Sequence, residues 1–185
     1  TQLEAVCAVR SIERASVFSR KVERREKFAI DMSRHLGIEV SSVESAEECV
    51  RNSDILVTIT SSSRPVLEGE WLSSGMHINA AGANNWMKRE LDGKAVGLSN
   101  IIVTDDVDQA KLECGDLLYP IERGVISWEQ VRNLSDVIGR RTPGRINPED
   151  ITLFESQGLA LEDIAVGARV YELARQQGIG KDISF

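Results

Sequence analysis

Three residues near the start of the chain, Ser19, Arg20 and Lys21, have the chemistry of a phosphate site. They close the short apolar segment 15–19, and the range Arg10–Lys27 holds seven basic and three acidic residues in a chain of net charge −7. In a dinucleotide-binding fold this strand end meets the adenosine ribose, where a carboxylate selects NAD and an arginine accommodates the 2′-phosphate of NADP. Arg20 therefore favours NADP. The other basic residues are attributed to a solvated helix face: Arg24, Arg25 and Lys27.

A second candidate site is the segment MHINAAGANNWMKREL, residues 76–91. It begins like a buried strand and then breaks into the small residues Ala80, Ala81 and Gly82, followed by two asparagines and Trp86. Ligands of open parallel sheets bind at the carboxyl ends of strands, and small residues let a ligand approach the backbone. The pattern predicts a functional loop.

Hydroxyl groups follow another expected strand, at residues 54–60. Thr58, Thr60 and Ser61 lie at or just beyond its end. Their hydroxyls can bind a dinucleotide at this edge of the sheet. The alternative is that they only satisfy backbone groups at the strand end.

Short apolar runs alternate with helical periodicity along the chain. Strands are expected at 15–19, 38–43, 54–60, 76–81 and 100–106, and helices at 22–36, 46–53 and 159–178, with Gly37 ending the first of these helices. This alternation predicts an α/β fold with a doubly wound parallel sheet.

The first ten residues indicate a helix that no strand precedes. A dinucleotide-binding domain opens instead on a central strand and a glycine-rich turn, and no G-x-G-x-x-G occurs here between a strand and a helix. The expectation is a fragment, a Rossmann-like sheet that lacks its first strand. The alternative is a smaller α/β fold that begins with a helix.

Composition excludes several classes of protein. The 185 residues, of which 42 % are hydrophobic, suit one globular domain. A net charge of −7 argues against nucleic-acid or membrane-surface partners. Three separated cysteines favour a reducing cytoplasm without disulfides. The histidines His35 and His77 stand alone, so no metal site is expected.

Three blocks of the chain, residues 54–91, 103–117 and 151–180, resemble the ornithine cyclodeaminase, mu-crystallin and archaeal alanine dehydrogenase family. The resemblance implies a two-lobed enzyme, with residues 1–148 in the Rossmann lobe and residues 149–185 returning as a helix to a substrate and dimerisation lobe. That lobe is absent from this sequence, and a homodimer would form through it.

The resemblance also assigns site residues. It places Ala80, Ala81 and Gly82 against the nicotinamide, and it brings Ser156 near the same end of the cofactor. Lys88 matches a lysine near the cofactor, although it can equally be a solvated helix start. Asn84 stands where the cyclodeaminases have an aspartate that acts as acid or base, and an amide cannot take up a proton near neutral pH.

The function implied is hydride transfer between NADP(H), or NAD(H), and the carbon–nitrogen bond of a small imino acid or amino acid. One alternative is ornithine cyclodeaminase, against which Asn84 and Arg20 both count. A second is a mu-crystallin-like protein that binds NADPH and a small ligand. Turnover of cyclic imines with NADPH distinguishes an enzyme from a pure binder.

Overall fold

The computed structural model describes residues 1–51 and 53–183. Its strands are β1 (Arg14–Val17), β2 (Glu39–Ser42), β3 (Ile55–Thr58), β4 (His77–Ala80), β5 (Ile101–Thr104), β6 (Val131–Asn133) and β7 (Thr152–Glu155). Its α-helices are α1 (Gln2–Val9), α2 (Val22–Leu36), α3 (Ala46–Val50), α4 (Gly93–Leu98), α5 (Val107–Glu113), α6 (Gly115–Glu122), α7 (Leu134–Ile138) and α8 (Ala160–Gln176). Two short 3-10 helices span Gly69–Trp71 and Trp128–Gln130.

The larger sheet holds five parallel strands in the order β3-β4-β7-β5-β6. The last strand in sequence, β7, lies in the middle, where Leu153 is in register with Ile78 of β4 and with Ile102 of β5. Alternate strand residues face a core on one side of the sheet, together with apolar residues of α4, α5 and α6. Burial of this face holds the strands in one register and so aligns their ends.

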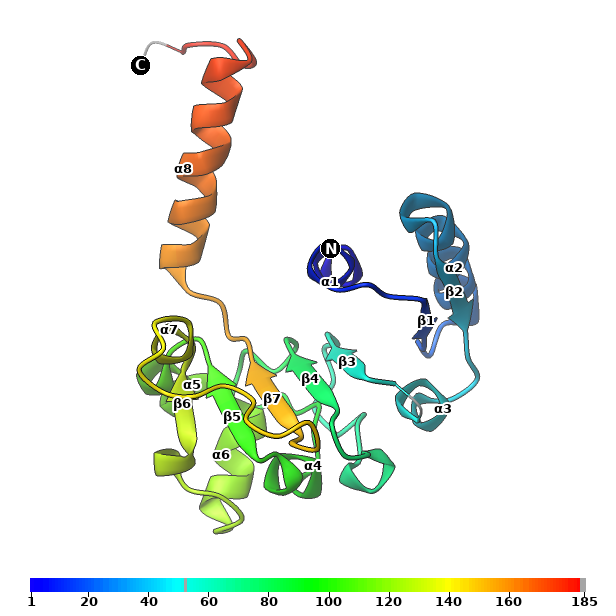
Figure 1. The fold of residues 1–185 in the computed structure, drawn as a ribbon, viewed down its shortest axis with the longest axis vertical. Coiled ribbons are helices and arrows are strands. Elements are labelled where there is room, and N and C mark those ends of the chain that lie inside the picture. The colour runs from blue at the N-terminus through cyan, green and yellow to red at the C-terminus, as the bar shows by residue number, and fades with distance from the viewer. Residues whose placement is uncertain (52, 184–185) are drawn as a thin grey trace.

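The smaller sheet pairs β1 with β2 in parallel, and α2 packs on both strands. Helix α2 spans the predicted residues 22–36, and Gly37 ends it in the left-handed conformation with φ 68°. Only glycine adopts this conformation without a steric cost from Cβ, which explains why the helix ends there. Figure 1 shows this unit beside the larger sheet.

The α/β fold with parallel strands is confirmed, but the strands form two sheets. Within the described residues, no strand hydrogen-bonds to both β1 and β3, so the two halves are not joined into one doubly wound sheet. The first central strand expected from the sequence stays a prediction. Observed strand ends differ from the predicted ones by one or two residues, because hydrogen bonding to a neighbour defines a strand end.

Residues 149–185, expected to leave the Rossmann lobe, divide into two parts. Strand β7 is an integral part of the five-stranded sheet, whereas α8 stands away from it (Figure 1). None of the residues of α8 is buried. Among the described residues, no helix combines the length and apolarity that crossing a membrane requires.

Candidate functional site

The carboxyl ends of β3, β4 and β7 lie side by side at one edge of the five-stranded sheet (Figure 1). The N–H of Ala81 donates to the carbonyl of Thr58 at 2.8 Å, and the N–H of Ser156 donates to the carbonyl of Ala80 at 2.8 Å. Four predicted cofactor residues, from three segments of the chain, are thus brought together. This edge is where open α/β sheets bind ligands.

Gly82 is buried at this edge because other groups fill the space that a side chain would need. A Cβ at this position would meet the Thr60 carbonyl oxygen and would lie 2.5 Å from the carboxylate of Glu90. That carboxylate accepts hydrogen bonds from two backbone N–H groups, those of Thr60 and, at 2.9 Å, Gly82. Glu90 therefore connects the end of β3 to the loop after β4.

The three predicted hydroxyl residues differ in their surroundings. The Thr58 hydroxyl is buried and has no hydrogen-bond partner within residues 1–51 and 53–183. The Thr60 hydroxyl accepts from the N–H of Ser62 at 3.1 Å, the local strand-end role that was the alternative prediction. Ser61 is exposed. Thr58 is the one of these three whose buried hydroxyl still needs a partner, which a bound ligand could provide.

The two predicted catalytic residues, Asn84 and Lys88, lie together on the loop after β4. The Lys88 ammonium donates to the Asn84 side-chain oxygen at 3.0 Å, and this contact lies at the protein surface. The amide group of Asn84 keeps two N–H donors, and the ammonium keeps further protons to donate. Trp86, considered as packing or as a pocket wall, is 65 % exposed and so is not a core residue.

The start of helix α6 packs against the backbone of this loop. A Cβ at Gly115 would overlap the carbonyl oxygen of Lys88, so the loop backbone lies directly on the start of the helix. One turn further, the ring of Tyr119 stacks with the guanidinium of Arg89 at 3.7 Å and, on its other side, with that of Arg123 at 3.6 Å.

Asp116 of α6 is fully buried and binds the backbone at the end of the loop. One of its carboxylate oxygens accepts from the N–H groups of Glu90 and Leu91, each at 2.8 Å. Burial raises the pKa of Asp116 to about 7, against the lowering effect of these two hydrogen bonds. Burial likewise raises the pKa of Glu155 well above its usual range, with the nearby Asp116 charge adding to the effect.

The turn after β7 is fixed in a similar way. One carboxylate oxygen of the buried Asp105 accepts from the N–H groups of Gln157 and Gly158, both at 2.7 Å. Gly158 has φ 82°, the left-handed conformation expected for a tight turn at this glycine. Ser156 is therefore held between this turn and the carbonyl of Ala80.

Sequence reasoning missed the three carboxylates that hold these loops: Asp105, Glu90 and Asp116. Glu90 lies in the charged segment 88–92, Asp105 lies at the end of the predicted strand 100–106, and Asp116 precedes the apolar segment 117–121. Their burial depends on which strands and helices pack together. An acidic residue next to the small-residue loop, such as Glu90, was the only local signal available.

Ser19, Arg20 and Lys21 follow β1 in the smaller sheet, apart from the residues grouped at the larger sheet. Arg20 and Lys21 are exposed, as a surface phosphate contact requires. The prediction of a solvated face is wrong for Arg25. Its side chain is buried, donates to the Ser19 carbonyl at 3.3 Å and pairs with Glu44 at 3.1 Å, so it supports the strand end.

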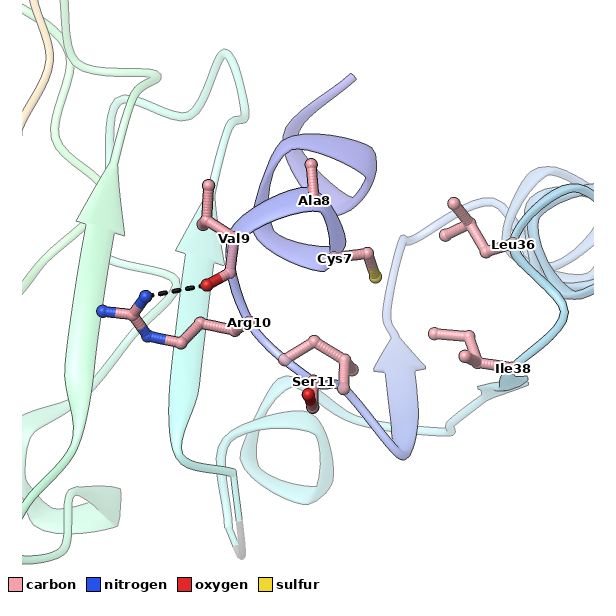
Figure 2. A pocket seen from close by; sticks show the side chains of 8 residues that line it. Cys7, Ala8, Val9, Arg10, Ser11, Leu36 and Ile38 are labelled. Carbon is pink, nitrogen blue, oxygen red and sulfur yellow. Dashed lines mark hydrogen bonds between the residues drawn. The ribbon is translucent and has the colours of Figure 1, made fainter.

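A separate hollow of about 400 Å³ lies between the end of α1 and the junction of α2 with β2 (Figure 2). Cys7, Leu36 and Ile38 line it together with polar groups of the segment after α1, and the Arg10 guanidinium, which points away from these three side chains, donates to the Val9 carbonyl at 2.8 Å. None of the predicted cofactor residues lines this hollow. Its location does not coincide with the strand-end site.

The strand-end site brings small residues and polar groups together. It offers small residues at Ala80, Ala81 and Gly82, the free hydroxyl of Thr58 and the backbone turn at Ser156. A side chain on Gly82 would collide with the Thr60 carbonyl and the Glu90 carboxylate and so displace the loop. The arrangement defines a parallel α/β protein whose ligand-binding edge suits a flat, polar-rimmed group.

Residues 1–178 match the ornithine cyclodeaminase/mu-crystallin family, and the chain belongs to that family. It is 40 % identical to Thermococcus litoralis Δ1-pyrroline-2-carboxylate reductase, whose structure was solved with NADH and L-proline, at a TM-score of 0.95. It is 38 % identical to an archaeal alanine dehydrogenase, solved as a dimer with bound NAD, at a TM-score of 0.90. It is 30 % identical to Paracoccus denitrificans iminosuccinate reductase, solved with NAD+, at a TM-score of 0.90.

These matches cover 98 %, 100 % and 100 % of the chain and, in each case, 56 % of the solved relative. The chain likewise spans 56 % of the length of the first curated relatives that it matches. The family and the fold are therefore established over nearly all of this chain.

Proposed function

We propose that this protein uses a nicotinamide dinucleotide to reduce the carbon–nitrogen double bond of a small imino acid, or to oxidise the corresponding amino acid. The observation that carries the proposal is the grouping of Thr58, Ala80, Ala81 and Ser156 at one sheet edge, with Gly82 packed against Glu90 beside them. The names of the relatives, two imine reductases and an amino-acid dehydrogenase, support the same reaction class.

In this mechanism Ala80, Ala81 and Gly82 provide the surface for the nicotinamide ring, and Thr58 and Ser156 offer polar groups at its rim. The dinucleotide, when bound, supplies or accepts the hydride. The chain itself fixes the distance and direction of the transfer, which controls the rate strongly.

Asn84 and Lys88 act on the substrate side of the loop. Asn84 holds a polar substrate group through its free N–H donors, because an amide cannot exchange a proton near neutral pH. Lys88 is the member of this hydrogen-bonded pair that carries transferable protons. The same chemistry argues against deamination of ornithine, which needs an acid or base at the position of Asn84.

The choice of dinucleotide is the finer part of the proposal. The exposed Arg20 at the end of β1, beside Ser19 and Lys21, favours the 2′-phosphate of NADP(H). NAD(H) is the second possibility, since the three solved relatives hold NADH, NAD or NAD+.

We also propose that the protein is a homodimer whose α8 is covered by the family's second lobe. Helix α8 exposes large apolar side chains, among them Leu161, Ile164 and Tyr171. Exposed apolar area of this kind marks an interaction surface. Light scattering on the full-length gene product tests this, and a monomer would contradict it.

The test of the activity uses the full-length gene product in two assays. Oxidation of NADPH and of NADH is followed with pyrroline-2-carboxylate, and ammonia release is followed with ornithine. We expect imine reduction and no release of ammonia from ornithine. Saturable binding of NADPH without oxidation of it would favour a mu-crystallin-like binder, and rapid ornithine turnover would contradict the role given to Asn84.

A further inference from the structure

Glu90 is a fully buried carboxylate with an unusual set of partners. It accepts from the backbone N–H of Thr60, beyond β3, and from that of Gly82, beyond β4. Within the described part of the chain no lysine or arginine forms an ion pair with it. Its hydrogen bonds to the two strand-end loops are therefore its main compensation for burial.

The position of Glu90 is itself fixed from the opposite side. Its backbone N–H donates to Asp116 of α6, and its backbone carbonyl accepts from the N–H groups of Val66 and Leu67 at 2.7 and 3.0 Å. The backbone on which the carboxylate is mounted is thus anchored by a helix and by a second loop. A rigidly mounted carboxylate sets the spacing of the two groups that it binds.

We propose that Glu90 is a positioning residue for hydride transfer. Its carboxylate sets the separation between the end of β3 and the Ala80–Gly82 loop, and thereby the surface against which the nicotinamide ring lies. This inference rests on the proposed function. It assigns Glu90 an effect on the rate of transfer at saturating dinucleotide.

Energetics favour this role over a purely structural one. An isolated buried carboxylate is costly, and a neutral or apolar side chain stabilises a core at lower cost. Gly82 argues in the same direction, because the missing side chain lets the loop backbone reach the carboxylate. The buried carboxylate and the glycine therefore both hold the loop in one position.

The test compares two variants of Glu90 with a matched control in the full-length protein. In Glu90→Gln the side chain keeps its shape, but an NH2 group replaces one of the two acceptor oxygens, so it can no longer satisfy both N–H groups in place. Glu90→Asp keeps the charge but is too short to reach both, and it carries the test if the glutamine variant does not fold.

The control is Asp92→Ala, which removes the side-chain acceptor. One oxygen of Asp92 accepts from the N–H groups of Gly69 at 2.9 Å and Ala95 at 2.7 Å, so it also joins two backbone segments. These bonds cap α4 and fix the preceding loop. Neither bond involves the strand-end residues Ala80–Gly82. The control therefore loses comparable bonds without touching the proposed nicotinamide surface.

Three quantities are measured: the dinucleotide Kd, the rate at saturating dinucleotide and imine, and the isotope effect with dinucleotide deuterated at the transferred hydrogen. In both Glu90 variants we expect the rate to fall roughly ten- to a hundredfold and the isotope effect to rise, with Kd changing less than about threefold. Asp92→Ala is expected to lower only the melting temperature.

Glu90 variants that lose thermal stability but keep the rate and the isotope effect would overturn the positioning role and leave the proposed function intact. If the unaltered protein binds neither NADH nor NADPH, the proposed function fails and this inference fails with it. A control variant that slows transfer as much as Glu90→Gln would also overturn the inference, since the effect would then be a general one.

Discussion

The two ends of the proposed dinucleotide site are built in opposite ways. At the five-stranded sheet, the loops beyond β3, β4 and β7 are tied by the buried carboxylates Glu90 and Asp105. After β1, Arg20 and Lys21 are exposed on a short turn. Buried hydrogen bonds restrict the backbone, whereas exposed charges attract a ligand and leave their own side chains free.

The difference separates two tasks. Hydride transfer requires a ring held at a defined distance, which a rigid loop provides. Choosing between dinucleotides requires only a charge that meets or repels one phosphate. Changes near the larger sheet should therefore alter folding and rate, and changes after β1 should alter affinity.

The largest expected effect is that of Gly115→Ala at the support of the strand-end loop. The new Cβ would overlap the carbonyl oxygen of Lys88, a backbone atom that cannot rotate away. We expect a loss of about 3 kcal/mol in the free energy of unfolding, measured by urea denaturation. Gly93→Ala, where a Cβ meets nothing within 4 Å, is the control and should stay within about 0.5 kcal/mol.

Arg20→Ala tests the exposed end. It should weaken NADPH binding by about 1.5–3 kcal/mol, or roughly ten- to a hundred-and-fiftyfold, and leave NADH binding nearly unchanged, because only NADPH has a 2′-phosphate. Isothermal titration with both dinucleotides measures this. Equal weakening of the two would make Arg20 structural, and tighter binding of NADH by the unaltered protein would contradict the preference for NADP.

Asp116 predicts a dependence of stability on pH. Its pKa is raised by burial to about 7 in the folded protein, so below this pH the folded state keeps a proton that the unfolded chain loses near its ordinary pKa of about 3.9. Stability from this group is therefore present at low pH and is lost as the pH rises through about 7.

The measurement is urea denaturation of the unaltered protein and of Asp116→Asn at pH 5 and pH 6.5. Asparagine cannot ionise, so the unaltered protein should lose about 1–2 kcal/mol more than the variant between these two values. Glu155 is present in both proteins, but the variant lacks the Asp116 charge that helps to raise the pKa of Glu155, so the difference includes this coupling. Parallel losses would mean that Asp116 stays ionised in the fold.

The smallest effect is expected for Arg123→Ala. Arg123 is exposed and covers one face of the Tyr119 ring, while Arg89 keeps the other. Its removal should cost about 0.5–1 kcal/mol of stability in thermal unfolding. Arg175→Ala on α8, whose guanidinium lies 5.9 Å from the Tyr171 ring, is the control, and a larger loss there would contradict this ranking.

Local signals predicted the parts of the fold that local interactions decide. Helix α2 ends at Gly37 as expected, because a glycine there determines the end of the helix. The place of β7 between β4 and β5 was not predicted, since its pairing partners lie far away in the sequence.

The same distinction applies to the site. The small residues Ala80–Gly82 were recognisable from their composition and their place after a strand. Glu90 and Asp116 were not, because a charged residue is usually solvated and only the packing of α6 against the loop buries these two. The burial of Arg25 was not predicted for the same reason, since a basic residue on a helix is usually solvated.

The most direct test of the central claim is the single-turnover rate of imine reduction by Gly82→Ala in the full-length protein at saturating NADPH. The new Cβ would displace the loop from the Thr60 carbonyl and from Glu90. The account predicts a rate at least about tenfold lower, with the NADPH Kd within about threefold of the unaltered value. An unchanged rate in a folded variant would contradict the placement of the nicotinamide at this strand end.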